Sequence, residues 1–140
     1  MIERINESGH RVLAKRIKVE EGTNYIDKVW TRAENNVGEI SKFLYSDGVS
    51  LSYFGFEKDG FYYAGFEVDK PFKEEDHIGW FDIEIKSGEY LRSLVEEDYE
   101  ITLSEMKKYA RENNIQYNHV PLDRALNGET YIYLSLSTVA

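Results

Sequence analysis

Apolar and polar residues alternate in several short stretches of the chain, and two of these stretches are interrupted by a tight-turn dipeptide. Asp59-Gly60 and Asn127-Gly128 each lie between runs that are rich in aromatic and β-branched residues. This combination is typical of a type I′ turn, because both central residues of that turn need a positive φ. The pattern therefore predicts two β-hairpins whose turns are 68 residues apart.

Two other stretches repeat their apolar residues at intervals of three and four, which indicates amphipathic helices packed on a sheet. The stripe of the first helix consists of Ile26, Val29, Trp30, Ala33, Val37, Ile40 and Leu44. The stripe of the second consists of Leu103, Met106 and Ala110. Thr102 and Glu105 have the spacing of a capping box before the second helix, and Asn113-Asn114 supply its end.

The offset of 68 also overlays residues 11–19 on residues 79–87, both of which alternate as strands do. We therefore predict an internal repeat of two β-α-β-β units, at about 10–68 and 79–138, joined by a linker at 69–78. A chain of 140 residues is the length of one ordinary domain. The expected fold is α+β, a single domain with one curved antiparallel sheet and its helices on one face.

Side chains alternate between the two faces of a strand, so the hairpin registers assign each residue to a face. The face covered by helices should hold Tyr62, Ala64, Phe66, Val68, Ile132, Leu134, Phe81, Ile83 and Ile85. One residue does not fit, because the register directs Asp123 into this core beside Ile132. We expect a bulge or another irregularity near Pro121 to resolve the conflict.

The opposite face is predicted to expose an aromatic array with one carboxylate. Its members are Trp80, Tyr63, Tyr131, Tyr133, Phe56 and Glu129. Aromatic faces attract positive charge, and a partly desolvated glutamate would fix the orientation of a cation. The array predicts a site for a hydrophobic or cationic small molecule with Glu129 as the charge partner. The alternative is that these aromatic residues are present because they favour strands.

Composition narrows the possible functions. The net charge is −9, with 26 acidic and 17 basic residues, and it disfavours direct binding to nucleic acid. No stretch is apolar for long enough to span a membrane or to form a signal peptide, and no cysteine is present. These features favour a cytoplasmic protein that does not bind membranes.

No cofactor or metal is expected. The glycines at positions 55, 60 and 65 surround a hairpin and lead into no helix, so they do not form a phosphate-binding loop. His10, His77 and His119 are far apart in the sequence and lack the spacing of paired metal ligands.

The layout of the chain resembles the GyrI-like effector-binding domains. The segments that carry the resemblance are Phe61–Val68, Ile85–Tyr90, Pro121–Ala125 and Glu129–Leu134, in two copies of β-α-β-β that span nearly the whole chain. The resemblance implies a cleft between the repeats, lined by aromatic residues and an acid, that binds small hydrophobic or cationic molecules. The family's closing acid-aromatic stretch falls on Glu129–Tyr131, and its usual acid after the proline falls on Asp123.

Members of this family serve as drug-sensing modules of bacterial transcription regulators, as gyrase inhibitors or as hydrolases of reactive toxins. Because no helix-turn-helix precedes the domain here, we expect a stand-alone binding protein, hydrolase or inhibitor rather than a one-component regulator. A binding protein is favoured over an enzyme, because the sequence contains no oxyanion-hole motif and no Ser-His-Asp arrangement. In a hydrolase, Glu129 would act as the general base. In an inhibitor, the acidic runs at 74–76 and 96–98 would bind a basic protein that handles nucleic acid.

Overall fold

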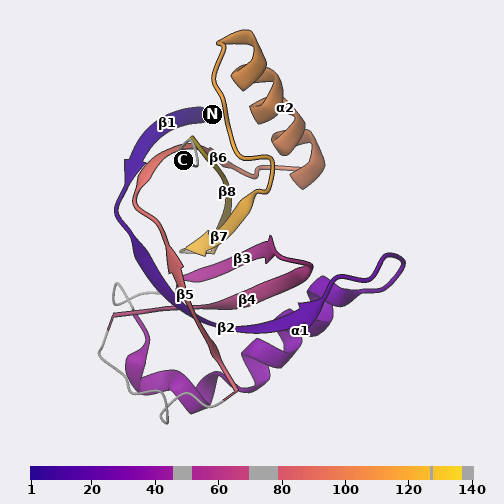
Figure 1. Ribbon diagram of the computed structural model, residues 1–140, viewed down its shortest axis with the longest axis vertical. Helices are drawn as coiled ribbons and strands as arrows, with labels where there is room; N and C mark the ends of the chain where they lie inside the picture. The colour runs from indigo at the N-terminus through magenta and orange to yellow at the C-terminus, as the bar shows by residue number, and fades with distance from the viewer. Residues whose placement is uncertain (46–51, 70–78, 127, 137–140) are drawn as a thin grey trace.

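A computed structural model describes residues 1–45, 52–69, 79–126 and 128–136. These residues form one antiparallel sheet of eight strands together with three helical segments (Figure 1). The strands are β1 (Ile2–Glu7), β2 (His10–Lys18), β3 (Tyr53–Lys58), β4 (Phe61–Val68), β5 (Phe81–Ile85), β6 (Gly88–Leu94), β7 (Leu122–Leu126) and β8 (Glu129–Ser135). The helices are α1 (Tyr25–Asn35), the 3-10 helix η1 (Val37–Phe43) and α2 (Tyr99–Glu112). The predicted fold class is confirmed.

The order of the strands, β1-β6-β8-β7-β3-β4-β2-β5, shows the internal repeat. β2, α1, β3 and β4 form one half, and β6, α2, β7 and β8 form the other. The halves join where β3 pairs with β7. The two edge strands cross over between the halves. β1 precedes the first half in the sequence but pairs with β6 of the second, and β5 precedes the second half but pairs with β2 of the first.

The predicted offset of 68 holds for the two hairpins but not for the strands that precede the helices. Leu13 in β2 pairs with Phe66, and Leu91 in β6 pairs with Leu134. Residues 66 and 134 are 68 apart, but residues 13 and 91 are 78 apart, so β2 corresponds to β6. The overlay of 11–19 on 79–87 is therefore wrong, because Phe81–Ile85 is the added edge strand β5.

The error in the overlay also reversed the faces of β5. Ile83 and Ile85 belong to an apolar cluster on the face without helices, together with Val12, Ala14 and Phe54. Phe81 pairs with Ala14 on that same face and is 38% exposed. Trp80, expected on the open face, instead packs against Phe66 and the residues of η1. The faces of β5 are reversed because this strand pairs with β2. The pairing places Ile83 beside Val12 and Phe81 beside Ala14, on the face without helices.

The helix-bearing face holds a separate apolar core in each half. Under α1 and η1, buried Val29, Ala33 and Ile40 lie over Tyr62 and Phe66 of β4, as the sequence predicted. Under α2, Met106 and Ala110 pack on Leu91, Ile132 and Leu134. Figure 1 shows α1 and α2 as separate projections on the outer side of the curled sheet. α1 packs against β2 and β4, and α2 packs against β6, so the two helices lie on either side of the junction of β3 and β7.

The ends of the elements follow local chemistry. Asp59 and Gly60 have φ values of 52° and 82°, as the predicted type I′ turn requires, whereas Asn127 lies outside the described residues. The predicted capping box is wrong: the N-cap of α2 is Asp98, whose carboxylate accepts a hydrogen bond from the Ile101 amide at 3.0 Å. Thr102 is already inside the helix.

None of the helices in the described part of the chain has both the length and the apolar character needed to cross a lipid bilayer.

Candidate ligand-binding cleft

A cavity of about 820 Å³ lies between the two halves, on the face of the sheet that bears the helices. α1, β3 and β4 of the first half and α2, β7 and β8 of the second half contribute to it. The residues that line it are Tyr25, Ile26, Trp30, Glu34, Tyr53, Glu57, Tyr62, Tyr99, Glu100, His119, Val120, Pro121, Asp123, Arg124, Ala125 and Thr130. This volume is in the range of pockets that hold drug-sized ligands.

Aromatic side chains form the walls of the cleft. Tyr25 and Tyr62 meet edge to face, with ring centroids 6.2 Å apart, and Trp30 and Tyr53 meet in the same way at the same separation. Tyr99 faces them from the second half. Tyr25 is the first residue of α1 and Tyr99 the first residue of α2, so the internal repeat places a tyrosine at the same point on each side of the cleft.

The carboxyl group of Asp123 lies at the floor of the cleft. One oxygen accepts a hydrogen bond of 2.6 Å from the Tyr99 hydroxyl, and the other lies 3.4 Å from the hydroxyl of Tyr62. Burial raises the pKa of Asp123 to about 6, although the two hydroxyl groups act to lower it. Burial and the adjacent carboxylate also raise the pKa values of Tyr62 and Tyr99. At neutral pH this site therefore holds a half-buried anion between two neutral phenols.

The conflict that the sequence placed at Asp123 is real, but the bulge expected near Pro121 is absent. β7 pairs without interruption with β3 on one side and β8 on the other, and Asp123 lies beside Ile132 as the register required. The carboxyl group escapes the apolar core because it faces the cleft, where the hydroxyl groups of Tyr99 and Tyr62 lie within hydrogen-bonding distance of it. The misfit was thus a signal of the cleft, and the family resemblance had marked the same residue.

Cations are scarce around Asp123. Glu34, Glu57 and Glu100 lie at the border of the cleft and are exposed. Arg124 also contributes to the lining, but its guanidinium group lies on the other face of the sheet, where it is hydrogen-bonded. Among the described residues that line the cleft, no lysine is present and no ion pair to Asp123 is formed.

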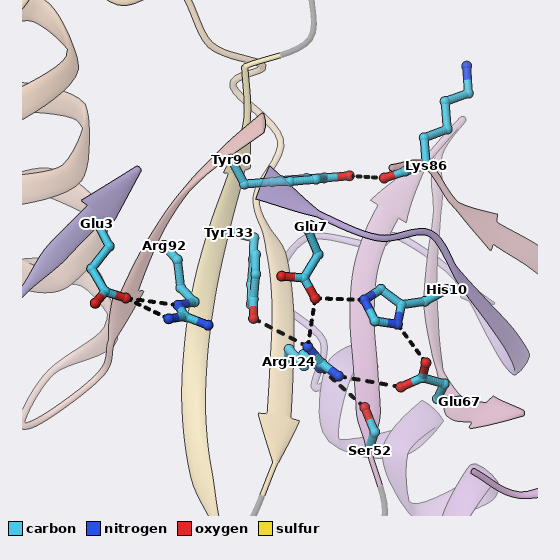
Figure 2. A network of polar contacts seen from close by, with 10 residues as sticks. All are labelled: Glu3, Glu7, His10, Ser52, Glu67, Lys86, Tyr90, Arg92, Arg124 and Tyr133. Atoms are coloured by element: carbon cyan, nitrogen blue, oxygen red, sulfur yellow. Dashed lines mark hydrogen bonds and ion pairs between the residues drawn. The ribbon is translucent and has the colours of Figure 1, made fainter. Parts of the chain in front are cut away.

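A polar network occupies the opposite face of the sheet, around the guanidinium group of Arg124 (Figure 2). Arg124 donates to Glu7 at 3.2 Å, to Glu67 at 3.4 Å and to the Ser52 hydroxyl at 3.2 Å. His10 bridges the same two carboxylates, at 2.9 Å from Glu7 and 2.5 Å from Glu67. The side chains of Arg124 and Glu67 are each 10% exposed. The network joins β1, β2, β4 and β7, and so it ties the two halves together.

The charges in this network compensate one another. Burial by itself lowers the pKa of His10, but hydrogen bonds to Glu67 and Glu7 outweigh burial and raise the pKa. Burial likewise opposes ionisation of Glu67, and the hydrogen bond from His10, with further help from Ser52 and Arg124, lowers its pKa below the usual value. In this network the shifts of His10 and Glu67 thus each favour the charged form of the group.

None of the six residues that the sequence proposed for the site lines the cleft. Glu129 is exposed and accepts a hydrogen bond of 2.9 Å from Tyr131, at the start of β8. Tyr133 is buried on the network face, where its ring meets Tyr90 edge to face and its hydroxyl lies 3.4 Å from Arg124.

Of the other three candidates, Phe56 and Tyr63 belong to the first half, and Trp80 packs against it. Phe56 and Tyr63 stack with ring centroids 5.3 Å apart, inside the apolar cluster on the face without helices. Trp80 is buried under Lys15 and donates a hydrogen bond of 3.0 Å to Glu39. The structure thus brings Phe56 together with Tyr63, and Glu129 together with Tyr131, but it does not gather the six around one ligand.

Metal-ligating side chains do not gather in groups of three or more anywhere in the described residues.

The sequence matches none of the protein-family models and none of the curated proteins with which it was compared. Solved structures do match. SAV2435 bound to tetraphenylphosphonium has a TM-score of 0.66 at 13% identity, over 96% of this chain and 93% of that one. The C-terminal domain of EcmrR has a TM-score of 0.68 at 14% identity, over 99% and 98% of the two chains. A putative transcription regulation protein from Staphylococcus aureus has a TM-score of 0.63 at 12% identity, over 96% and 97%.

These neighbours are GyrI-like effector-binding domains. The chain has the fold of that family. The resemblance found in the sequence is therefore confirmed for the architecture. At these low identities the likeness concerns the fold, so the assignment of a ligand has to come from the residues of the cleft itself.

Proposed function

We propose that this GyrI-like domain binds a hydrophobic cation in the cleft between its halves, with Asp123 as the charge partner. The observation that carries the proposal is the environment of Asp123: a half-buried carboxyl group without a basic partner among the described residues, at the floor of an aromatic cavity. A buried charge that the protein does not neutralise itself is costly unless a ligand neutralises it. A bound cation would supply the missing charge.

The walls of the cleft favour the same class of ligand. Five aromatic side chains, Tyr25, Trp30, Tyr53, Tyr62 and Tyr99, line the cavity. A cation over an aromatic face gains about 0.5–2 kcal/mol per ring, with the larger values in dry sites. The aromatic surface also provides apolar area for the hydrophobic part of the ligand, and the exposed acids at the border attract cations from solution.

Asp123 suits this role better than Glu129, which the sequence analysis proposed. Glu129 is exposed and its carboxylate is already paired with Tyr131, so a cation near it would remain in water and gain little. The neighbour SAV2435, whose structure contains tetraphenylphosphonium, adds support, because that ligand is a hydrophobic cation and the two proteins share a fold.

Calorimetric titration with tetraphenylphosphonium chloride tests the proposal. At about pH 7.5 we expect Asp123→Asn to weaken binding by at least about tenfold, because it removes the charge and keeps the shape. Glu129→Gln is the matched control and should bind as the wild type does. Neutral triphenylphosphine oxide should bind the wild type and Asp123→Asn with equal affinity.

Undiminished binding of tetraphenylphosphonium by Asp123→Asn would refute the role of Asp123. If Glu129→Gln lost binding instead, the site would lie on the face without helices, where the sequence analysis placed it.

A further inference from the structure

Position 55 is the counterpart of position 123 in the internal repeat. Gly55 of β3 and Asp123 of β7 lie directly opposite each other in the pairing of the two strands. They are also 68 residues apart, which is the offset that relates the two hairpins. Gly55 and Asp123 therefore occupy equivalent positions in the two halves. The pseudo-twofold axis that relates the halves passes between these two residues. One of these equivalent positions carries an acid and the other carries no side chain.

The space beside Gly55 is filled by the side chain of Tyr62. A Cβ atom at position 55 would overlap the Tyr62 hydroxyl oxygen, and it would lie 3.2 Å from Cζ of Tyr62 and 3.1 Å from the ring of Trp30. The Tyr62 hydroxyl is the group that reaches Asp123, at 3.4 Å. No φ of the left-handed type is recorded for Gly55, so the backbone does not require a glycine there. Glycine is needed because Tyr62 passes so closely.

We propose that Gly55 is a positioning residue for the cation site, because its missing side chain lets the Tyr62 hydroxyl reach the carboxyl group of Asp123. The proposal rests on the proposed function in one respect, since Asp123 is the charge partner named there. The proposal also gives a reason why only one of the two equivalent positions carries an acid. The second half supplies Asp123, and the first half supplies, at Gly55, the space in which the Tyr62 hydroxyl stabilises the Asp123 carboxylate.

The consequence of this arrangement is a carboxyl group that remains ionised at neutral pH. Burial raises the pKa of Asp123, and the hydroxyls of Tyr99 and Tyr62 act against burial by donating to the charged form. Glu100 also faces Asp123 and raises its pKa. The remaining ionisable side chains that line the cleft are Tyr25, Tyr53, Glu34, Glu57 and His119, besides Arg124, whose guanidinium lies on the opposite face.

The test uses the protein without ligand, so that its result does not depend on the identity of the ligand. The titration of the Asp123 carboxyl carbon, followed by NMR, should move to higher pH by about half a pH unit or more in Gly55→Ala. Tyr62→Phe should shift the titration of Asp123 by the same amount. The double variant Gly55→Ala/Tyr62→Phe should shift it no further, because both substitutions remove the same Tyr62 hydroxyl from Asp123. Gly38→Ala is the control, because a Cβ there meets no atom within 4 Å.

The melting temperature provides a second test. Gly55→Ala should lower it by about 6 °C or more in the wild type and by about half as much in the Tyr62→Phe background, because the phenylalanine lacks the overlapping oxygen. If the single variant Gly55→Ala fails to fold, a folded double variant Gly55→Ala/Tyr62→Phe would likewise show that the clash is with the Tyr62 hydroxyl.

Two results would overturn the proposal: an unchanged titration of Asp123 in Tyr62→Phe, or an equal cost of Gly55→Ala in both backgrounds. If instead the titrations shift as expected but tetraphenylphosphonium does not bind, the proposed function fails and the role of Gly55 stands.

Discussion

Asp123 and Arg124 are neighbours in β7, yet their side chains lie on opposite faces of the sheet in opposite electrostatic situations. Arg124 is surrounded by Glu7, Glu67, Ser52 and Tyr133, which satisfy its guanidinium group. The carboxyl group of Asp123 is half-buried, with only two phenol hydroxyls as donors among the described residues. Both charges lie at the junction of β3 and β7, so their different surroundings do not come from their position along the sheet.

The difference separates structure from function at this junction. A buried charge that has its counter-charges in the same chain holds strands together, because removing one member leaves the others uncompensated. A buried charge that lacks a counter-charge destabilises the unliganded protein and is a candidate for ligand binding. The same comparison predicts opposite signs for mutations at the two neighbouring positions.

The largest effect is expected on the network face. Arg124→Met should lower the free energy of unfolding by about 3 kcal/mol or more, because it leaves Glu7 and Glu67 buried with only His10 as a counter-charge. Urea unfolding at about pH 7.5 measures this. The control is Arg4→Ala, which breaks an exposed pair with Glu89 and should cost no more than about 1 kcal/mol. Equal costs for the two variants would show that the network contributes no more than an exposed pair.

Asp123→Asn should have the opposite sign and raise the stability of the unliganded protein by about 2 kcal/mol above pH 7. The pKa of Asp123 is raised from 3.8 to about 6 in the folded protein. Stability from the protonated carboxyl is therefore complete below the unfolded pKa and is lost as the pH rises through about 6. The gain in stability from Asp123→Asn should vanish near pH 4. Thermal unfolding of the variant and the wild type, near pH 4 and above pH 7, measures this difference. A destabilised variant at high pH would mean that Asp123 is already compensated.

His10 predicts a smaller effect that depends on pH. Its pKa is raised above 6.5 in the folded state, so its contribution is present below that value and is lost as the pH rises through the folded pKa. His10→Gln should therefore cost about 1 kcal/mol more at pH 6 than at pH 9. A cost for His10→Gln that does not change with pH would indicate a role in packing alone.

The smallest effect is expected from an exposed acid at the border of the cleft. Glu57→Gln should weaken the binding of tetraphenylphosphonium by about twofold at low salt and have no effect at high salt, because exposed charges are screened. Calorimetric titration at two salt concentrations measures this. A loss as large as that of Asp123→Asn would mean that the border, and not the floor, holds the cation.

The sequence predicted the parts of the fold that local chemistry determines. The turn at Asp59-Gly60 and the stripe that includes Val29 and Ala33 depend on neighbouring residues, and the structure confirms both. The faces of β5 depend on which strand lies beside it, and sequence alternation looks the same in either case. Trp80 was therefore placed on the wrong face.

The site was harder to predict because it depends on what does not cover the sheet. Alternation correctly directed Asp123 to the helix-bearing face, but it could not show that α1 and α2 leave β7 open there. A polar residue at a position that should be core is thus more informative than an aromatic array on a strand. Glu129 and its tyrosine neighbours looked like a site because aromatic residues favour strands, whether or not they bind anything.

The most direct test of the central claim is the titration of the Asp123 carboxyl carbon by NMR, with and without saturating tetraphenylphosphonium. If the cation pairs with the carboxylate, linkage requires the ligand to lower the midpoint from about 6 by about one pH unit or more. A midpoint that stays the same when the cation is bound would contradict the account, because the ligand would then occupy the domain without neutralising its buried charge.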